Sequence, residues 1–283
     1  MEHAVAIRDV HKTVDNFQLK SIHWEIEKGT ISALIGKNGA GKSTLLNLIM
    51  NLTKTDVGDI QILGQSVSRE DDSWKPKVAY LPQKPPIITP FTGQELRDLI
   101  AQWYPTWDES FFQRAVALFG IDLTTKFNKL SPGAQQQLNL ALVIARNAEV
   151  LILDEPTAHL DIPSKKILGD LLVEWMDLGE RTIILATHQI EDIQKLADYL
   201  VFIKDGCIQE KFEKEALTDM YKRYWFSQPI ECGFVPGEVE RKGNSIVTNR
   251  PIEAEDYFEH AELEWITVQS LDLDEIVTML LIK

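Results

Sequence analysis

The segment Gly36-Lys37-Asn38-Gly39-Ala40-Gly41-Lys42-Ser43 fits the pattern G-x-x-x-x-G-K-[ST] without a gap. A short apolar run rich in β-branched residues, 31 to 35, precedes it, and leucine and isoleucine follow at helical spacing as far as Asn51. Glycines let the backbone curl so that successive N–H groups point at phosphate oxygens, and the next helix adds its dipole. The segment therefore predicts a phosphate loop between a strand and a helix.

In such a loop Lys42 is expected to hold the β- and γ-phosphates of ATP, and the Ser43 hydroxyl to bind Mg²⁺. The other residues from Gly36 onward, and Thr44 after them, complete the predicted nucleotide contacts. The alternative is a chance glycine-rich loop that caps a helix, and the strand and helix on either side disfavour it.

A second apolar run, 150 to 153, ends in two carboxylates, Asp154 and Glu155. An aspartate that follows a buried strand beside a phosphate loop holds Mg²⁺ in phosphate-loop ATPases. The next carboxylate is then placed to orient and deprotonate water. Elsewhere an Asp-Glu pair after a strand is an ordinary helix-starting turn, which Pro156 also fits. With the phosphate loop present, the sequence favours a metal ligand and a general base.

Composition limits the class of partner. The 283 residues include 43 acidic and 29 basic ones, a net charge of −14, which argues against nucleic acid as a partner. No apolar run approaches the roughly 20 residues that span a bilayer, and the N-terminus lacks the pattern of a signal peptide. We therefore expect a cytoplasmic chain whose membrane pore, if it drives transport, lies on another chain.

Apolar strands alternate with helical patterns along most of the chain, which predicts a layered α/β fold. Helices are expected over 92 to 103, 108 to 119, 138 to 147 and 165 to 178, and Ser131 and Pro132 have the residue types of an N-cap and a first helical position. After about Glu210 the character changes. Residues 211 to 283 are predicted to form a small α/β tail of two or three strands and one or two helices.

Five segments resemble motifs of the nucleotide-binding subunits of ATP-binding cassette (ABC) transporters and follow the phosphate loop in that family's order. They are Tyr80-Leu81-Pro82-Gln83, Leu130-Ser131-Pro132-Gly133-Ala134, Asp154-Glu155, Ala158-His159-Leu160-Asp161 and Thr187-His188. The resemblance covers about residues 1 to 210. It implies an α/β phosphate-loop NTPase with a mixed sheet core, an antiparallel β subdomain and a helical signature subdomain near 84 to 147.

The resemblance also implies a role for each matching residue. Gln83 would sense Mg²⁺ and the attacking water, Glu155 would be the general base, and His188 would contact the γ-phosphate. Asp161 would help to join two cassettes, although it could simply cap the next helix. Ser131 and Gly133 would act in trans on ATP bound by a partner cassette.

Two departures from the family are visible. The signature is usually Leu-Ser-Gly-Gly-Gln, but Pro132 replaces its first glycine and Ala134 its glutamine. Pro132 has no N–H to donate to phosphate, so we expect a working but weakened trans contact. The family's adenine-stacking aromatic aligns with Val14, which leaves Phe17 or Phe226 as candidates.

The tract Trp103 to Asp108 is either the local packing of a helix–helix corner or a likeness to ABC ATPases of bacterial bacitracin- and lantibiotic-type exporters. The favoured function is thus an ATPase that pairs with an identical or different second cassette and docks on a separate permease at the inner face of the membrane. The alternative is a soluble ABC ATPase without a transport role, of the assembly-factor type. The tail would be a dimerisation or regulatory element, or an inert appendage.

Overall fold

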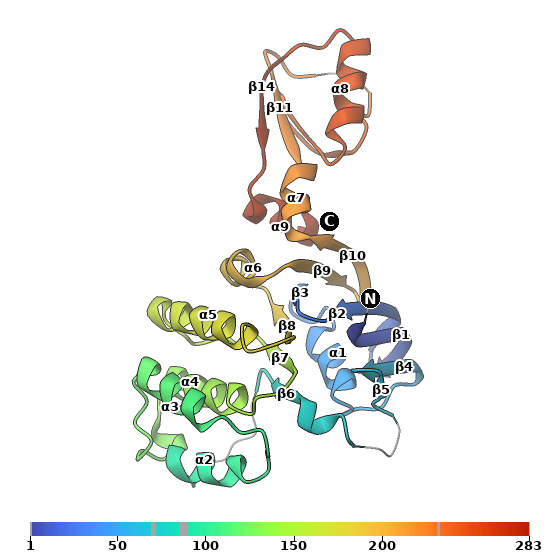
Figure 1. The fold of residues 1–283 in the computed structure, drawn as a ribbon. Coiled ribbons are helices and arrows are strands. Elements are labelled where there is room, and N and C mark those ends of the chain that lie inside the picture. The colour runs from blue at the N-terminus through green and yellow to red at the C-terminus, as the bar shows by residue number, and fades with distance from the viewer. Residues whose placement is uncertain (1, 69–71, 85–89, 231–232, 283) are drawn as a thin grey trace. The chain divides into compact units, whose positions relative to one another are not determined.

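The computed structural model describes residues 2–68, 72–84, 90–230 and 233–282. The chain divides into two compact units, Met1–Lys211 and Phe212–Lys283, both drawn in Figure 1. Within the described part of the chain, every helix is too short or too polar to cross a membrane.

A six-stranded sheet forms the centre of the first unit, in the order β10-β9-β3-β8-β7-β6. Its strands are β3 (Ile31–Ile35), β6 (Val78–Leu81), β7 (Val150–Asp154), β8 (Thr182–Thr187), β9 (Tyr199–Lys204) and β10 (Cys207–Glu213). The pairs β6–β7, β7–β8, β8–β3 and β3–β9 are parallel. Every residue of β3, β7 and β8 is buried, because helices or a second sheet cover both faces.

Alternate residues of the central strands enter two separate cores. Ile152 and Ile184 face a core shared with α1 (Lys42–Ile49) and a four-stranded antiparallel sheet in the order β2-β1-β4-β5. Leu153 and Leu185 face the opposite core, which is shared with helices. The bounds are β1 (His3–Val14), β2 (Phe17–Glu27), β4 (Val57–Ile62), β5 (Gln65–Ser66), α2 (Gly93–Ala101), α3 (Glu109–Phe119), α4 (Pro132–Ile144), α5 (Ile162–Met176) and α6 (Ile190–Leu196), with 3₁₀ turns at Lys75–Lys77 and Phe127–Lys129.

Side-chain caps fix where the helices of the second core begin. Thr92 and Glu95 form a reciprocal capping box at the start of α2. Asp108, Ser131 and Asp161 accept hydrogen bonds from the first turns of α3, α4 and α5. Each such cap contributes on the order of 1 kcal/mol. The signature helix α4 therefore begins at Pro132, six residues before the apolar run from which a helix over 138 to 147 was predicted.

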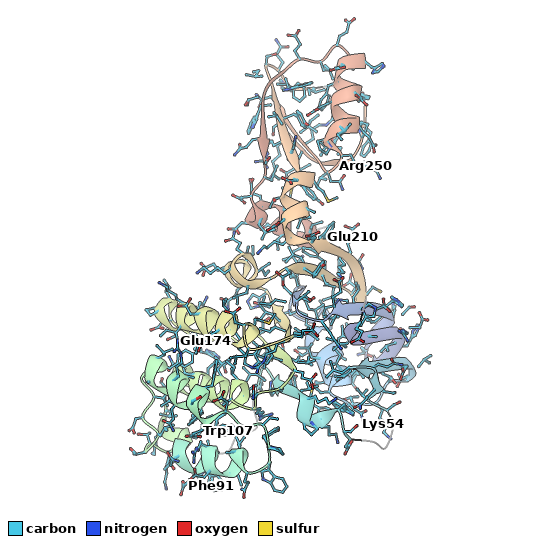
Figure 2. All side chains as sticks on the ribbon, in the orientation of Figure 1. Lys54, Phe91, Trp107, Glu174, Glu210 and Arg250 are labelled. Atoms are coloured by element: carbon cyan, nitrogen blue, oxygen red, sulfur yellow. The ribbon has the colours of Figure 1, made fainter. Side chains whose placement is uncertain are left out.

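The aromatic tract between α2 and α3 packs locally. The Trp107 indole N–H donates to Glu109 at 2.8 Å, and its ring lies 5.4 Å from that of Phe112. The Arg146 guanidinium stands over the Tyr104 ring at 4.7 Å. Figure 2 labels Trp107 among these helices. These contacts are those of a helix–helix corner, the first of the two predicted explanations.

The second unit is larger in structure than predicted. Its four-stranded antiparallel sheet has the order β12-β13-β11-β14, and an aromatic core of Tyr224, Phe226 and Phe258 joins that sheet to α8. The elements are α7 (Lys214–Met220), β11 (Lys222–Phe226), β12 (Glu238–Lys242), β13 (Ser245–Thr248), α8 (Pro251–His260), β14 (Trp265–Ser270) and α9 (Leu273–Ile282). Two to three strands were predicted because polar edge strands such as β12 have no apolar alternation to mark them.

Candidate functional site

The predicted phosphate loop joins β3 to α1. Gly39 and Gly41 have φ of 84° and 111°, in the left-handed region that favours glycine. A Cβ on Gly36 would lie 2.5 Å from the Ile203 carbonyl oxygen, so this position also admits only glycine. The glycine spacing thus matches the steric demands of a loop whose N–H groups precede a helix N-terminus, which is an arrangement that binds phosphate.

Lys42 is the cation of this loop, and its side chain is almost fully buried. Its ammonium donates to the Gly36 carbonyl oxygen at 2.7 Å and lies 3.6 Å from Oε1 of Glu155. A buried ammonium needs such partners because desolvation strongly disfavours an isolated charge. The loop therefore holds a positive charge between the glycines and the acidic pair.

Asp154 ends β7 and is buried with 1% of its surface exposed. Neither carboxylate oxygen has a hydrogen-bond partner of normal geometry, although the Ser43 hydroxyl lies near enough to lower the pKa of Asp154 in part. Burial outweighs this effect and raises that pKa above its usual value of 3.8. A buried carboxylate without a partner is costly in free energy.

These donors fit Mg²⁺, which takes one or two protein oxygens and obtains its other ligands from phosphate and water. Ser43 and Asp154 supply a hydroxyl and a carboxylate. Gln83, an exposed residue two positions after β6, has its backbone N–H close to Asp154 and lines the same cavity as Ser43. No cluster of three or more His, Cys, Asp or Glu side chains suited to a metal occurs among the described residues.

Glu155 follows Asp154 in a left-handed conformation with φ 51°. This backbone is uncommon for a residue with a side chain and is held here by a hydrogen bond from the Glu155 N–H to the Ala186 carbonyl oxygen. The carboxylate is 3% exposed, and Nδ1 of His188 lies 2.9 Å from it. Because β7 and β8 are parallel neighbours, the residues that follow them meet at one edge of the sheet.

A cavity of about 580 Å³ opens over these groups. Gln83 and Glu155 line it, and so does the phosphate loop with Lys37, Asn38, Gly39, Gly41, Lys42, Ser43 and Thr44. The tip of the β1–β2 hairpin, residues 14 to 17, completes the lining. The structure thus brings together the phosphate-loop, glutamine and acidic residues that the sequence assigned to the site.

Ser131, Gly133 and Asp161 are not among the described residues that line this cavity. Ser131 accepts a hydrogen bond from the Ala134 N–H at 3.2 Å, and Asp161 accepts one from the Ser164 N–H at 2.9 Å, so both cap helices. A Cβ on Gly133 would lie 2.9 Å from the His159 carbonyl oxygen. The signature and the segment before α5 are therefore in contact, apart from the cavity of their own chain.

Two features of the site were missed at the sequence level. Asp15 and Asn16 line the cavity at the hairpin tip, and a two-residue polar turn between strands was the available signal. Gln136 is buried in α4 and donates to the Pro156 carbonyl oxygen at 2.9 Å, which ties the signature helix to the residue after Glu155. A buried glutamine in an apolar helix was the signal for that contact.

Known proteins resemble this chain in sequence. A family model described as ABC transporter matches residues 19–158. The SkfA peptide export ATP-binding protein SkfE of Bacillus subtilis (strain 168) is 34% identical over 70% of this chain and 86% of its own length. The petrobactin import ATP-binding protein FpuD of Bacillus anthracis is 32% identical over 71% of this chain and 77% of its own.

Solved structures resemble it in fold. A dimeric ATP-binding cassette in a post-hydrolysis state, bound to ADP and phosphate, superposes with a TM-score of 0.66 at 23% identity. The match covers 74% of this chain and 98% of that cassette. The predicted α/β phosphate-loop fold is therefore confirmed.

Proposed function

Because the chain belongs to the ABC transporter ATP-binding family and is an ATPase, we propose that it hydrolyses MgATP as the cytoplasmic subunit of an exporter with a separate permease. The observation that carries the proposal is the contact between buried Glu155 and His188 beside Lys42, at the open end of a phosphate loop. This edge of the sheet combines anion binding with a base, as phosphoryl transfer to water requires.

In this proposal the phosphates lie in the loop from Gly36 to Thr44, with Lys42 at the β- and γ-phosphates. Ser43, Asp154 and Gln83 hold Mg²⁺, which neutralises charge that develops on the phosphate oxygens. Glu155 accepts a proton from water as the water oxygen attacks the γ-phosphorus. The bond from that phosphorus to the β–γ bridging oxygen breaks, and ADP and inorganic phosphate are the products.

His188 has two tasks in this scheme. Its contact at 2.9 Å orients the Glu155 carboxylate toward the water. The imidazole, which is half exposed at the cavity, is the side chain that we assign to the γ-phosphate. A buried base that is held by an exposed partner reaches the reacting water without losing its own orientation.

A second cassette completes the site. Ser131 and Gly133 stand at the N-terminus of α4, an anion-binding position, yet they do not line the cavity of their own chain. One chain carries both a phosphate loop and a signature, so two copies related by a two-fold axis complete two equivalent sites. Asp161 joins the cassettes beside the signature, and a different cassette is the other candidate for the partner.

The permease is proposed to dock on the helical region that follows Gln83. Phe91, Leu99 and Trp103 are exposed apolar side chains there, and Trp103 is 75% exposed. Exposed apolar side chains that gather in one region often mark an interaction surface. Docking at this surface places the chain on the inner face of the membrane, and the likeness of residues 103 to 108 to exporter ATPases supports the direction of transport.

A soluble ABC ATPase of the assembly-factor type is the competing function. Fractionation of cells that express the full chain, followed by detergent extraction, separates the two. The transporter proposal expects the chain to sediment with membranes and to leave detergent extracts together with an integral membrane protein. Leu99→Glu and Trp103→Glu should release it, whereas the matched change Leu178→Glu on the exposed end of α5 should not. Recovery of the unaltered chain in the soluble fraction alone would support the assembly-factor function.

A further inference from the structure

The β1–β2 hairpin places two apolar side chains at the mouth of the nucleotide cavity. Val14 and Phe17 are directly paired across this antiparallel hairpin, and the turn between them consists of Asp15 and Asn16. Side chains of directly opposed residues lie on the same face of a sheet. Val14 and Phe17 therefore point to the same side, and both line the cavity.

The two ends of this cavity differ in chemistry. Gln83 and Glu155 stand beyond the phosphate loop at one end, where the terminal phosphate reacts. The remaining lining residues outside the loop are those of the hairpin tip. A nucleotide whose phosphates occupy the loop must then extend its ribose and base toward the hairpin.

Phe17 approaches the loop closely from this end. A Cβ built on Gly41 would stand 2.8 Å from Cζ and 3.2 Å from Cε1 of the Phe17 ring. The ring also packs against the core that includes Leu19, so only part of it is exposed. Among the described residues that line the cavity, Phe17 alone is aromatic.

We propose that Phe17 is the stacking platform for the nucleotide base, in place of an aromatic residue at position 14. This assignment rests on the proposed ATP-binding function and adds to it the residue that contacts the base. Val14 is exposed and aliphatic, so it flanks the base but offers no ring face. Stacking of a base on an aromatic ring adds affinity without reading the hydrogen-bonding edge of that base.

The competing explanation is that Phe17 only supports the fold of the loop through Gly41 and Leu19. The two explanations differ in which part of the ligand they affect. A stacking residue acts on the base, whereas a supporting residue acts on the phosphate cradle. Inorganic tripolyphosphate, which has no base, therefore separates them.

The test uses the full chain in calorimetric titrations with a non-hydrolysable ATP analogue and with inorganic tripolyphosphate, each with Mg²⁺. Phe17→Leu keeps an apolar side chain against Gly41 and Leu19 but removes the ring face. We expect it to weaken binding of the analogue about tenfold and to change binding of tripolyphosphate less than about twofold. Phe17→Trp retains a ring, so it should bind the analogue within about threefold of the unaltered chain.

Adding Val14→Tyr to Phe17→Leu supplies a ring from the opposed position and should recover most of the lost affinity for the analogue. Equal weakening of both ligands by Phe17→Leu would overturn the assignment in favour of loop support, and so would no change in either. If the unaltered chain bound neither ligand, the phosphate-binding function would itself fail, which is a distinguishable result.

Discussion

Nδ1 of His188 lies 2.9 Å from the carboxylate of Glu155, and the two residues follow neighbouring parallel strands. The carboxylate is buried, while 52% of the His188 side chain is exposed. This contact links the residue proposed to activate water with the one proposed to reach the γ-phosphate. It is the feature on which the account of hydrolysis depends.

Replacing His188 should disable hydrolysis while nucleotide binding persists. His188→Ala removes the group that orients Glu155, so we expect the ATPase rate to fall by about 100-fold or more. Affinity for ATP should change by less than about threefold, because the phosphate loop is intact. Phosphate release and equilibrium binding measure the two effects. His23→Ala, an exposed change on β2, is the control, and equal rates in both variants would remove His188 from the mechanism.

Pro132 gives a prediction of opposite sign. It occupies the first turn of α4, where it supplies no N–H. Pro132→Gly adds that donor, so we expect the ATPase rate of the paired cassettes to rise a few-fold, on the order of one hydrogen bond to a charged group. The same change should lower the free energy of unfolding by roughly 1 kcal/mol, since proline restricts the unfolded chain. An unchanged rate would mean that the signature N-terminus does not approach phosphate.

A change of pH tests the corner between α2 and α3. Burial alone would raise the pKa of Glu109, but hydrogen bonds from Arg97, Gln113 and Trp107 outweigh it and lower that pKa to about 2. The folded-state pKa is below the ordinary value of 4.5, so this stabilisation is present above pH 4.5 and is lost as pH falls toward 2.

The matching experiment follows urea unfolding by circular dichroism between pH 6 and pH 3. Glu109→Gln should lose less stability over that range than the unaltered chain. The difference should be below about 1 kcal/mol, because the carboxylate is partly exposed. Glu180→Gln in an exposed turn is the matched control. Parallel curves for Glu109→Gln and the unaltered chain would show that these hydrogen bonds do not favour the charged form.

The second unit should lose stability without loss of the ATP site. Phe258 is fully buried, with its ring 5.2 Å from Tyr224 and 5.1 Å from Phe226. Phe258→Ala should destabilise residues 212 to 283 by about 3–5 kcal/mol. Hydrogen exchange should report the loss there, and ATP affinity should be unchanged. Lowered ATP affinity in this variant would contradict independent folding of the two units.

The phosphate loop was predictable because its glycines and lysine are neighbours in sequence. The acidic pair was predictable for the same reason, since a fully buried strand reads as an apolar run before Asp154. The positive φ of Glu155 was not, because it depends on a hydrogen bond to Ala186, 31 positions away. Its contact with His188 likewise depends on the order of strands in the sheet.

Polar edges were the other limit. β10 and β12 consist largely of polar residues, so they carry no apolar alternation, and α6 spans only seven residues. The α4 boundary was missed because its first turn, before Leu138, is exposed or half-buried apart from Gln136. In each case the element is defined by its neighbours in space more than by its own pattern.

The most direct test of paired ATP sites is the solution mass of Glu155→Gln, measured by light scattering with and without MgATP. This substitution removes the proposed base but keeps the phosphate loop, so a closed pair of cassettes should accumulate. The account predicts a shift on adding MgATP from the 32.2 kDa monomer to about twice that mass. Changing Ser131 to Ala and Gly133 to Ala in the same chain should reduce the shift. A mass that stays monomeric while ATP is bound would contradict a site completed by a second copy of this chain.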